Sequence, residues 1–389
     1  METREVKLGD IATVKGGKRL PKGTSLITAP NNHPYIRVRD LNGRRTLELD
    51  SSFEFVDDET QKTISRYIVD AGDIVLSIVG TIGLVAIVGK SLDKANLTEN
   101  CVKLASLTDI DRDYLYYFLK SSFGQQEIAR GTVGAVQAKL PIKNIQDIAI
   151  PLPDEFTQRK IVATLASIDE KIETNQKIND NLQQQAKSLY EEMFLNNPDA
   201  DMVSGTLSDI AIITMGQSPS GSSYNEDSVG EVFYQGRAEF GFRFPTRRLF
   251  TTEPKRMAEP GDVLLSVRAP VGDLNAAYEK CCIGRGLGAI HSKTGDSSFM
   301  LYTMFALKPQ LDVFNGEGTV FGSINRDGLS NLPVNIPSAE EIAKFEAVVR
   351  PMDNLIRTNY EEICRLQSIR DSLLPKLMSG EIDVSAIQL

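Results

Sequence analysis

Apolar residues recur at alternating steps of four and three along two separate stretches of the chain. The first stretch comprises Ile161, Leu165, Ile168, Ile172, Asn175, Asn179, Leu182, Ala186, Leu189 and Met193. The second comprises Phe345, Val349, Met352, Ile356, Asn359, Ile363, Leu366, Arg370, Leu373 and Leu377. This spacing predicts two long helices with the seam of a coiled coil. Each position of the second stretch lies 184 residues after its counterpart in the first, which indicates an internal duplication.

The predicted helices carry start and stop signals. Asp154 is a candidate N-cap of the first helix, and Ser338 begins a capping box with Glu341 in front of the second. We expect the first helix to end near Pro198 and the second near Gly380. The chain then divides into a domain over 1–153, a helix over 154–197, a domain over 198–337, and a helix with a C-terminal tail over 338–389.

Two prolines interrupt the second helical pattern. Because proline lacks an N–H and clashes with the preceding turn, we expect this helix to kink or split near Pro351 and to fray after Leu374, next to Pro375. Two similar helices, each following a similar domain, pair most simply as an antiparallel coiled coil whose seam asparagines fix the register at some cost in stability. The alternative, in which each helix packs only on its own domain, would need fewer heptad-spaced positions.

The two domains share a framework of short matching segments. They are Leu-Gly-Asp-Ile-Ala at 8–12 and Leu-Ser-Asp-Ile-Ala at 207–211, a glycine at 17 and 216, and Tyr-Ile-Arg-Val-Arg at 35–39 beside Phe-Tyr-Gln-Gly-Arg at 233–237. In each copy a Gly-Asp turn precedes a buried strand, at 72–78 and 261–267, and a short aromatic helix follows, around 114–119 and 299–304. The predicted fold class is α+β: two similar strand-rich domains joined by two long helices, with an internal pseudo-twofold repeat.

Charge is distributed unevenly along the chain. The formal net charge is −9, which argues against a uniformly basic surface. Residues 1–45 nevertheless hold ten Lys and Arg against four Asp and Glu, and residues 237–256 hold six against two. Ordinary solvated faces would explain such stretches, but these two fall in corresponding parts of the two repeats.

The chain lacks the motifs of common catalytic sites. Its only histidines are His33 and His291, so a histidine-rich metal or catalytic cluster is excluded. Lys90-Ser91 resembles the end of a P-loop, but Leu84 stands where the first glycine is required. There is no Pro-Pro dipeptide, and therefore no Asn/Asp-Pro-Pro-Tyr/Phe methyltransferase motif, and no Gly-x-Ser-x-Gly elbow. We predict no catalytic residues and no metal ligands.

The cellular location can be predicted from hydrophobic runs, the N-terminal residues and the cysteines. No apolar run reaches the length of a membrane span, and no signal peptide opens the chain. The four cysteines show no Cys-x-x-Cys spacing, which is typical of a reducing compartment. We expect a cytoplasmic protein with no membrane partner.

The order of domain, helix, domain and helix resembles the DNA-specificity subunit of type I restriction–modification systems over nearly the whole chain. The motifs that carry the resemblance lie at 8–12, 35–39, 72–75, 150–153, 215–219, 260–264 and 284–287, and in the helices at 165–172 and 373–380. One departure is Asn-Cys-Val at 100–102, where the second copy has Gly-Arg-Gly-Leu.

The resemblance implies a function that no single motif would give. Each domain would be a target-recognition domain that reads one half of a split, asymmetric sequence in double-stranded DNA. The helices would act as a spacer and as the docking surface for two methyltransferase subunits, which bring S-adenosylmethionine and methylate adenine. Restriction subunits with motor and nuclease activity would join for cleavage. This chain would select the site, catalyse nothing and bind no cofactor.

Candidate DNA-binding residues follow from charge and from the matched segments, because Lys and Arg neutralise phosphates while Arg, Gln and Asn pair with base edges. They are Lys18, Arg19, Lys22, Arg37 and Arg39 in the first domain, and Gln217, Ser218, Arg237, Arg243, Arg247 and Arg268 in the second. Arg39 and Arg237 occupy matched positions. Two other hypotheses stay open: a tandem protein-interaction scaffold without a DNA role, and an enzyme with an unrecognised site.

Overall fold

The computed structural model describes residues 3–41, 43–134, 136–197, 202–315 and 322–384. The chain forms two compact units, one of Met1–Gln176 with Tyr360–Leu389 and one of Lys177–Asn359, here called unit 1 and unit 2. The division falls inside both long helices, so each unit contains one globule and half of each helix. The predicted helix end at Pro198 and the start of the second domain there lie outside the described residues.

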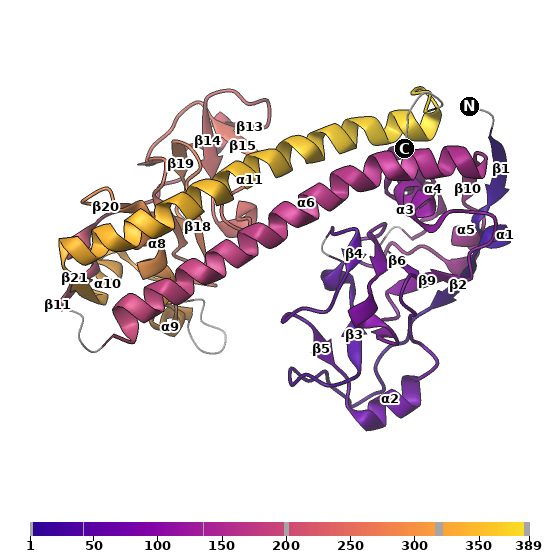
Figure 1. Cartoon of the computed structure of the whole chain (residues 1–389), viewed down its shortest axis with the longest axis horizontal. Coiled ribbons are helices and arrows are strands. Elements are labelled where there is room, and N and C mark those ends of the chain that lie inside the picture. The colour runs from indigo at the N-terminus through magenta and orange to yellow at the C-terminus, as the bar shows by residue number, and fades with distance from the viewer. Residues whose placement is uncertain (1–2, 42, 135, 198–201, 316–321, 385–389) are drawn as a thin grey trace. The chain divides into compact units, whose positions relative to one another are not determined.

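The two long helices begin where the sequence predicts. Helix α6 spans Glu155–Tyr190 and continues as the π-helical turn η3 (Glu191–Leu195), and α11 spans Ala339–Ser379 (Figure 1). The Asp154 carboxylate accepts the Thr157 N–H at 3.0 Å, and the Ser338 hydroxyl accepts the Glu341 N–H at 3.3 Å. Both predicted N-caps are therefore present.

Helix α11 runs unbroken through both of its prolines. The expected split near Pro351 and the fraying after Leu374 are therefore wrong, whereas the kink near Pro351 stays a prediction. An interior proline costs about 3 kcal/mol, but each buried apolar side chain of this size stabilises the fold by about 1.5–3 kcal/mol. The buried residues that flank the two prolines are Phe345, Val349, Ile356, Leu374, Leu377 and Met378.

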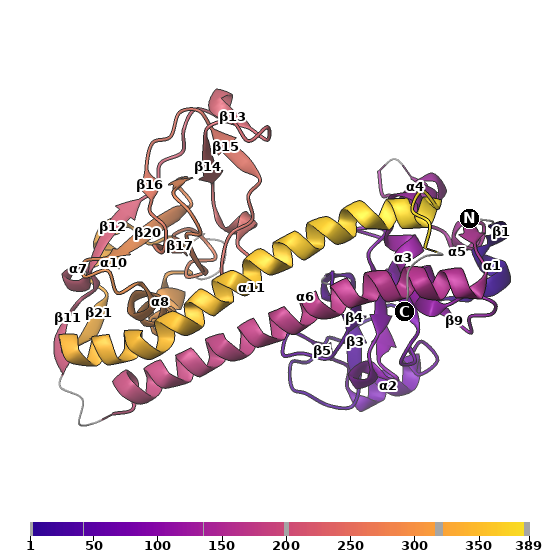
Figure 2. The same cartoon turned by 45° about the horizontal axis from the view of Figure 1, so that its top comes forward.

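Within each unit the segments of α6 and α11 run antiparallel (Figures 1 and 2). In unit 1, Asn175 donates to the Glu362 carboxylate at 2.7 Å. In unit 2, Asn359 donates to the Asn179 side-chain oxygen at 2.8 Å, and both asparagines are buried. A buried amide pair has few alternative partners, so it favours this register, as expected. Supercoiling of the two helices stays a prediction.

All the apolar seam positions are removed from solvent to some degree. Those that are buried are Ile161, Leu165, Ile172, Ala186, Phe345, Val349, Ile356, Ile363 and Leu377. Those that are partly buried are Ile168, Leu182, Leu189, Met193, Met352, Leu366 and Leu373. Several of them do not serve the opposite helix alone, since Ile161 and Leu165 belong to the core of the unit 1 globule.

Each globule contains two small sheets whose strands follow a common order. In unit 1 the first sheet has the strand order β2 (Thr13–Gly16), β9 (Cys101–Ala105), β6 (Ile74–Ser77), β7 (Val85–Val88), β4 (Thr46–Leu47). The second sheet of unit 1 has the order β5 (Glu54–Phe55), β3 (Pro34–Ile36), β8 (Asn96–Leu97). In unit 2 the first sheet has the strand order β12 (Ala211–Met215), β20 (Leu287–Ser292), β17 (Val263–Ser266), β18 (Leu274–Ala276). The second sheet of unit 2 has the order β13 (Tyr224–Asn225), β15 (Leu249–Thr251), β14 (Glu231–Tyr234), β19 (Cys281–Ile283), β16 (Met257–Ala258). The shared order confirms the predicted α+β repeat.

The remaining elements close each globule. Antiparallel strand pairs join β1 (Arg4–Lys7) to β10 (Ala149–Leu152) and β11 (Met202–Thr206) to β21 (Pro333–Pro337). The helices are α1 (Leu8–Ile11), α2 (Asp58–Ile64), α3 (Arg112–Lys120), α4 (Ser122–Gly131), α5 (Ile142–Gln146), α7 (Leu207–Ile210), α8 (Ser297–Ala306), α9 (Lys308–Asp312) and α10 (Arg326–Ser330). Short 3₁₀ turns include η1 (Val38–Asp40) and η5 (Arg237–Glu239).

In unit 1 the aromatic helix α3 packs between the sheet and the long helices, and a buried carboxylate fixes it there. Asp169 of α6 accepts the Tyr117 hydroxyl at 2.8 Å and the Arg370 guanidinium of α11 at 2.8 Å. Burial and the adjacent Asp169 carboxylate raise the pKa of Tyr117, which therefore stays protonated and donates. Three elements meet at this one side chain.

Unit 2 repeats this arrangement with a different source for the arginine. Asp353, the repeat counterpart of Asp169, accepts the Tyr302 hydroxyl of α8 at 3.1 Å and the Arg243 guanidinium at 2.9 Å. The position that matches Arg370 is Ala186, so the cation comes from the globule instead of the opposite helix. Arg243 is only 4% exposed, which removes it from the candidate DNA contacts.

Replacing Arg243 tests this structural role. Arg243→Ala should lower the free energy of unfolding by about 2 kcal/mol or more, because it removes a buried guanidinium and leaves the largely shielded Asp353 carboxylate without its cation. Arg247→Ala is the matched control, since Arg247 is exposed and pairs with Glu279, and it should cost less than about 1 kcal/mol. Urea denaturation of the two variants measures both values, and equal losses would contradict the assignment.

Candidate nucleic-acid interface

In unit 1, the candidate residues Lys18 and Arg19 follow β2 on a loop that backbone hydrogen bonds hold in place. The Gly17 N–H donates to the Cys101 carbonyl at 3.0 Å, and the Lys18 N–H donates to the Leu97 carbonyl at 2.8 Å. A Cβ atom at position 17 would lie 2.0 Å from the Thr98 carbonyl oxygen, so only glycine permits this approach. The loop after β2 is thereby held against the β8–β9 connection.

Unit 2 has the same backbone contacts with different side chains. The Gly216 N–H donates to the Leu287 carbonyl at 2.9 Å, and the Gln217 N–H donates to the Ile283 carbonyl at 3.0 Å. A Cβ atom at position 216 would lie 2.1 Å from the Gly284 carbonyl oxygen. Lys18 therefore corresponds to Gln217 and Arg19 to Ser218.

Strand register also matches Arg39 with Arg237. In the parallel pairs β3–β8 and β14–β19, Ile36 lies opposite Leu97 and Tyr234 opposite Ile283. Since Leu97 and Ile283 hold equivalent loop contacts, the residues three positions after Ile36 and Tyr234 are equivalent too. Both arginines are exposed on short 3₁₀ turns, η1 and η5.

Most of the exposed candidate arginines pair with carboxylates of their own unit. Arg19 lies 2.6 Å from Glu99, and Arg39 lies 2.7 Å from Glu54, which Arg37 also contacts. In unit 2, Arg247 pairs with Glu279 through two nitrogens. These ion pairs orient the guanidinium groups, and the carboxylates offset the positive charge of the surface around them.

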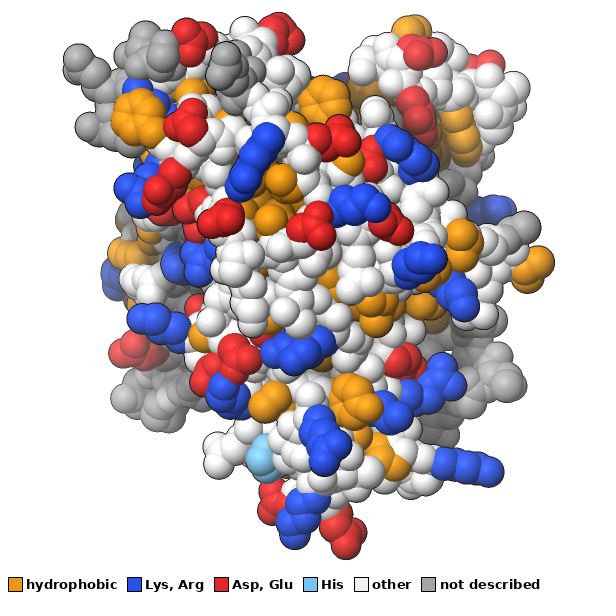
Figure 3. Space-filling view, turned by 90° about the vertical axis from the view of Figure 1, so that its right-hand side faces the viewer, with side chains coloured by type: hydrophobic (Ala, Val, Ile, Leu, Met, Phe, Trp, Pro, Cys, Tyr) orange, Lys and Arg blue, Asp and Glu red, His pale blue; other side chains and the backbone are white. Residues whose placement is uncertain are grey.

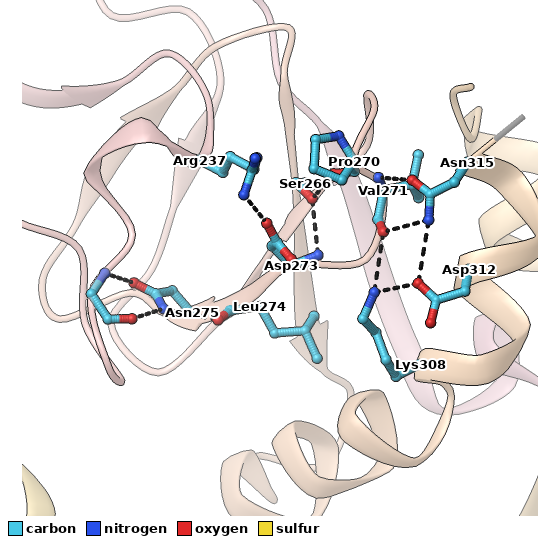
Figure 4. Close-up of polar contacts among 11 residues, drawn as sticks. Arg237, Ser266, Pro270, Val271, Asp273, Leu274, Asn275, Lys308, Asp312 and Asn315 are labelled. Atoms are coloured by element: carbon cyan, nitrogen blue, oxygen red, sulfur yellow. Dashed lines mark hydrogen bonds and ion pairs between the residues drawn. The ribbon is translucent and has the colours of Figure 1, made fainter. Parts of the chain in front are cut away.

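Arg237 in unit 2 pairs with a carboxylate that is itself held in place. Its guanidinium points toward Asp273 in the turn between β17 and β18 (Figure 4). The Asp273 N–H donates to the Ser266 hydroxyl at 2.9 Å, and Asn275 makes two hydrogen bonds to the Gly241 backbone. The turn therefore presents Arg237 in a defined direction.

Three candidate cations have no carboxylate partner among the described residues. Lys18 lies over the Tyr67 ring at 5.4 Å, and Lys22 and Arg268 are exposed. On the face drawn in Figure 3, Lys and Arg side chains are interspersed with Asp and Glu. That face therefore has no broad basic patch to attract a polyanion.

Several candidate residues lie on equivalent loops in the two units. Two further residues, Glu99 between β8 and β9 and Arg285 between β19 and β20, lie next to these loops. Sequence reasoning missed both, although the Gly-Arg-Gly-Leu segment was visible as a difference between the copies. Gln217 is exposed, and the Ser218 hydroxyl accepts the Arg285 N–H at 3.2 Å.

Other kinds of site find little support in the part of the chain that the structure describes. No group of three or more His, Cys, Asp or Glu residues there could hold a metal ion. Burial raises the pKa of the Cys101 and Cys281 thiols to about 12, so neither is an activated nucleophile. No helix among these residues is long and apolar enough to cross a membrane.

Comparison with known proteins agrees with this geometry. The family described as "Type I restriction modification DNA specificity domain" matches residues 1–184 and 200–365. A putative type I restriction enzyme MjaX specificity subunit of Methanocaldococcus jannaschii is 30% identical over 378 residues, covering 90% of this chain and 88% of that protein. The type I restriction enzyme MjaIX specificity subunit of the same organism is 23% identical over 413 residues, covering 98% and 94%.

A solved structure shares the fold. The crystal structure of the type I restriction–modification system S subunit from M. genitalium aligns with a TM-score of 0.56 at 18% identity, over 97% of this chain and 96% of that one. The class of protein follows from the match of the family to both repeats and from the relative that is 30% identical. The chain belongs to the family of type I restriction–modification DNA specificity subunits.

Asp40 makes the stability of the unit 1 loop depend on pH. Burial raises its pKa to about 6, against the opposing effect of Arg39, and its carboxylate accepts the Arg37 N–H at 2.7 Å. The folded protein therefore binds this proton more tightly than the unfolded chain. The resulting stabilisation is complete below pH 3.8 and is lost as pH rises through about 6.

We expect Asp40→Asn to remove this dependence, since an amide does not titrate. Between pH 4 and pH 6 the wild-type protein should lose stability relative to the variant. Thermal unfolding of both proteins across this range measures the difference, and parallel curves would show that Asp40 is not the group responsible.

Proposed function

We propose that this chain reads a bipartite, asymmetric sequence in double-stranded DNA, one half-site per globule, and recruits methyltransferase and restriction subunits to it. One observation carries the proposal: two globules have the same backbone contacts at their loop ends but different side chains there. Lys18 and Arg19 of one correspond to Gln217 and Ser218 of the other. Equivalent loops with different hydrogen-bonding groups suit two different base sequences.

The ion pairs at the candidate arginines are compatible with DNA binding. An exposed ion pair is worth only about 0–1 kcal/mol, because water already solvates both charges well. A phosphate oxygen or the edge of a base can take the place of the carboxylate at little cost, and phosphate contacts also release condensed counterions. In the absence of DNA, Glu54 would orient the Arg39 guanidinium and Asp273 would orient the Arg237 guanidinium.

The helices supply the partner surface in this proposal. Apolar side chains that remain exposed along α6 and α11 are Phe156, Ile178, Val348, Leu355 and Ile369. Exposed apolar residues on long helices suit partner helices of other subunits. We expect two methyltransferase subunits here, each with its own S-adenosylmethionine, and restriction subunits in the cleaving complex. This chain would itself catalyse nothing, bind no cofactor and act in the cytoplasm.

A protein-interaction scaffold without DNA recognition is the competing function. The net charge of −9 and the carboxylates paired with Arg19, Arg39, Arg237 and Arg247 favour it. Salt dependence separates the two, because phosphate contacts weaken as salt rises, whereas apolar docking does not.

DNA affinity of the complex with methyltransferase subunits should fall steeply with salt. For several phosphate contacts, log K should decrease linearly with log salt, by about 0.9 per contact. Fluorescence anisotropy with a labelled duplex between 50 and 200 mM salt, roughly the range over which such slopes are resolved, measures this. Binding that is absent or insensitive to salt would favour the scaffold.

Substitution of the matched arginines should affect the two half-sites separately. Arg39→Ala should weaken recognition of one half-site and Arg237→Ala the other, by about 1–3 kcal/mol for a base contact. Competition with duplexes that have one half-site scrambled distinguishes them, and Arg66→Ala is an exposed control in unit 1. If either variant weakened both half-sites equally, the assignment of one half-site to each globule would fail.

A further inference from the structure

One loop position in each unit carries opposite charge in the two repeats. In unit 1 this position lies in the connection between β8 and β9. The Thr98 N–H donates to the Ile36 carbonyl at 3.0 Å, and the Asn100 carbonyl accepts the Ile78 N–H at 2.8 Å. Glu99 lies between these two fixed residues.

The connection between β19 and β20 in unit 2 has the same two contacts. The Gly284 N–H donates to the Tyr234 carbonyl at 2.8 Å, and the Gly286 carbonyl accepts the Val267 N–H at 3.0 Å. Arg285 lies between them and therefore occupies the position of Glu99. Backbone geometry establishes this match, although the residue types share nothing.

Glu99 holds an arginine in unit 1. Its carboxylate accepts the Arg19 Nε–H at 2.6 Å and the Thr98 hydroxyl at 3.1 Å. Burial acts to raise the pKa of Glu99, but these hydrogen bonds outweigh it and lower the pKa, so the carboxylate stays charged. The result is a fixed, neutralised pair with Arg19 80% exposed.

Arg285 lacks such a counter-ion in unit 2. Among the described residues its side chain has no carboxylate partner, and its backbone N–H is held by the Ser218 hydroxyl. A Cβ atom at 284 or 286 would lie 2.8 Å from the Gln235 backbone. The two glycines therefore allow this loop to lie close to the residue that follows β14. An exposed cation on so closely held a backbone is positioned in advance for a ligand.

We propose that Arg285 is a base-reading residue of unit 2, and that Glu99 is the residue that positions Arg19 in unit 1. The inference rests on the proposed function and deepens it. Arginine offers a planar pair of donors that fits the O6 and N7 acceptors of guanine in the major groove. The ligand of Arg285 is therefore a guanine edge in one half-site only.

The test uses this chain in complex with its methyltransferase subunits and a library of duplexes randomised in one half-site at a time. Arg285→Gln should reduce the preference at one base pair of the unit 2 half-site by about tenfold or more, and leave the other half-site unchanged. Arg285→Lys should lose the same preference while retaining most of the affinity, because lysine keeps the charge but not the paired donors.

Lys293→Gln is the matched control, since Lys293 is exposed and lies just beyond the other end of β20. It removes the same charge and should leave every base preference intact. If Arg285→Gln instead weakened all sequences alike and reduced the salt slope by about one, Arg285 would be a phosphate contact and the inference would be overturned.

Glu99→Gln tests the positioning role in unit 1. It should change the preference in the unit 1 half-site alone, and add nothing in an Arg19→Gln background, since its effect passes through Arg19. Additive effects would overturn this part. If the wild-type complex showed no base preference in either half-site, the proposed function itself would fail; preferences that survive every Arg285 and Glu99 variant would refute only the inference.

Discussion

A carboxylate on each long helix, hydrogen-bonded to a tyrosine and an arginine, is the constraint around which each unit is built. Asp169 is buried and Asp353 is largely shielded from water, so each carboxylate is stabilised by hydrogen bonds from a tyrosine and an arginine. These hydrogen bonds fix the aromatic helix, α3 or α8, against the long helices. The sheet packs on the aromatic helix in one apolar core, and the loops with the candidate residues follow β2 and β12 or connect β8 to β9 and β19 to β20.

The loops themselves combine a shared backbone with divergent side chains. Gly17 and Gly216 allow the same close approach to the neighbouring strand connection, and equivalent hydrogen bonds follow on both sides. The chemistry displayed there differs, with Lys18 and Arg19 in unit 1 and Gln217 and Ser218 in unit 2. A framework that is fixed by backbone contacts tolerates such exchanges, because the exchanged side chains contribute little to folding. Under the proposed function, this separation of folding from recognition would let one scaffold serve two DNA sequences.

Much of the architecture could be predicted from the sequence, because heptad spacing, Gly-Asp turns and aromatic runs are local patterns. What failed depended on tertiary packing. Pro351 does not split α11, since buried residues on both sides hold the helix, and Arg243 is buried, although charge alone indicated an exposed residue. The correspondence of Glu99 and Arg285 was hidden because the loops before them differ in length. Only the hydrogen-bond register of the strands restores that alignment.

The most direct measurement is the pattern of adenine methylation in DNA from cells that express this chain together with type I methyltransferase subunits. Single-molecule sequencing gives the methylated motif. The account predicts two different half-sites separated by a gap of constant length and undefined sequence, because two non-identical globules read them. A single uninterrupted motif, two identical half-sites, or a stable complex that methylates no defined sequence would contradict it.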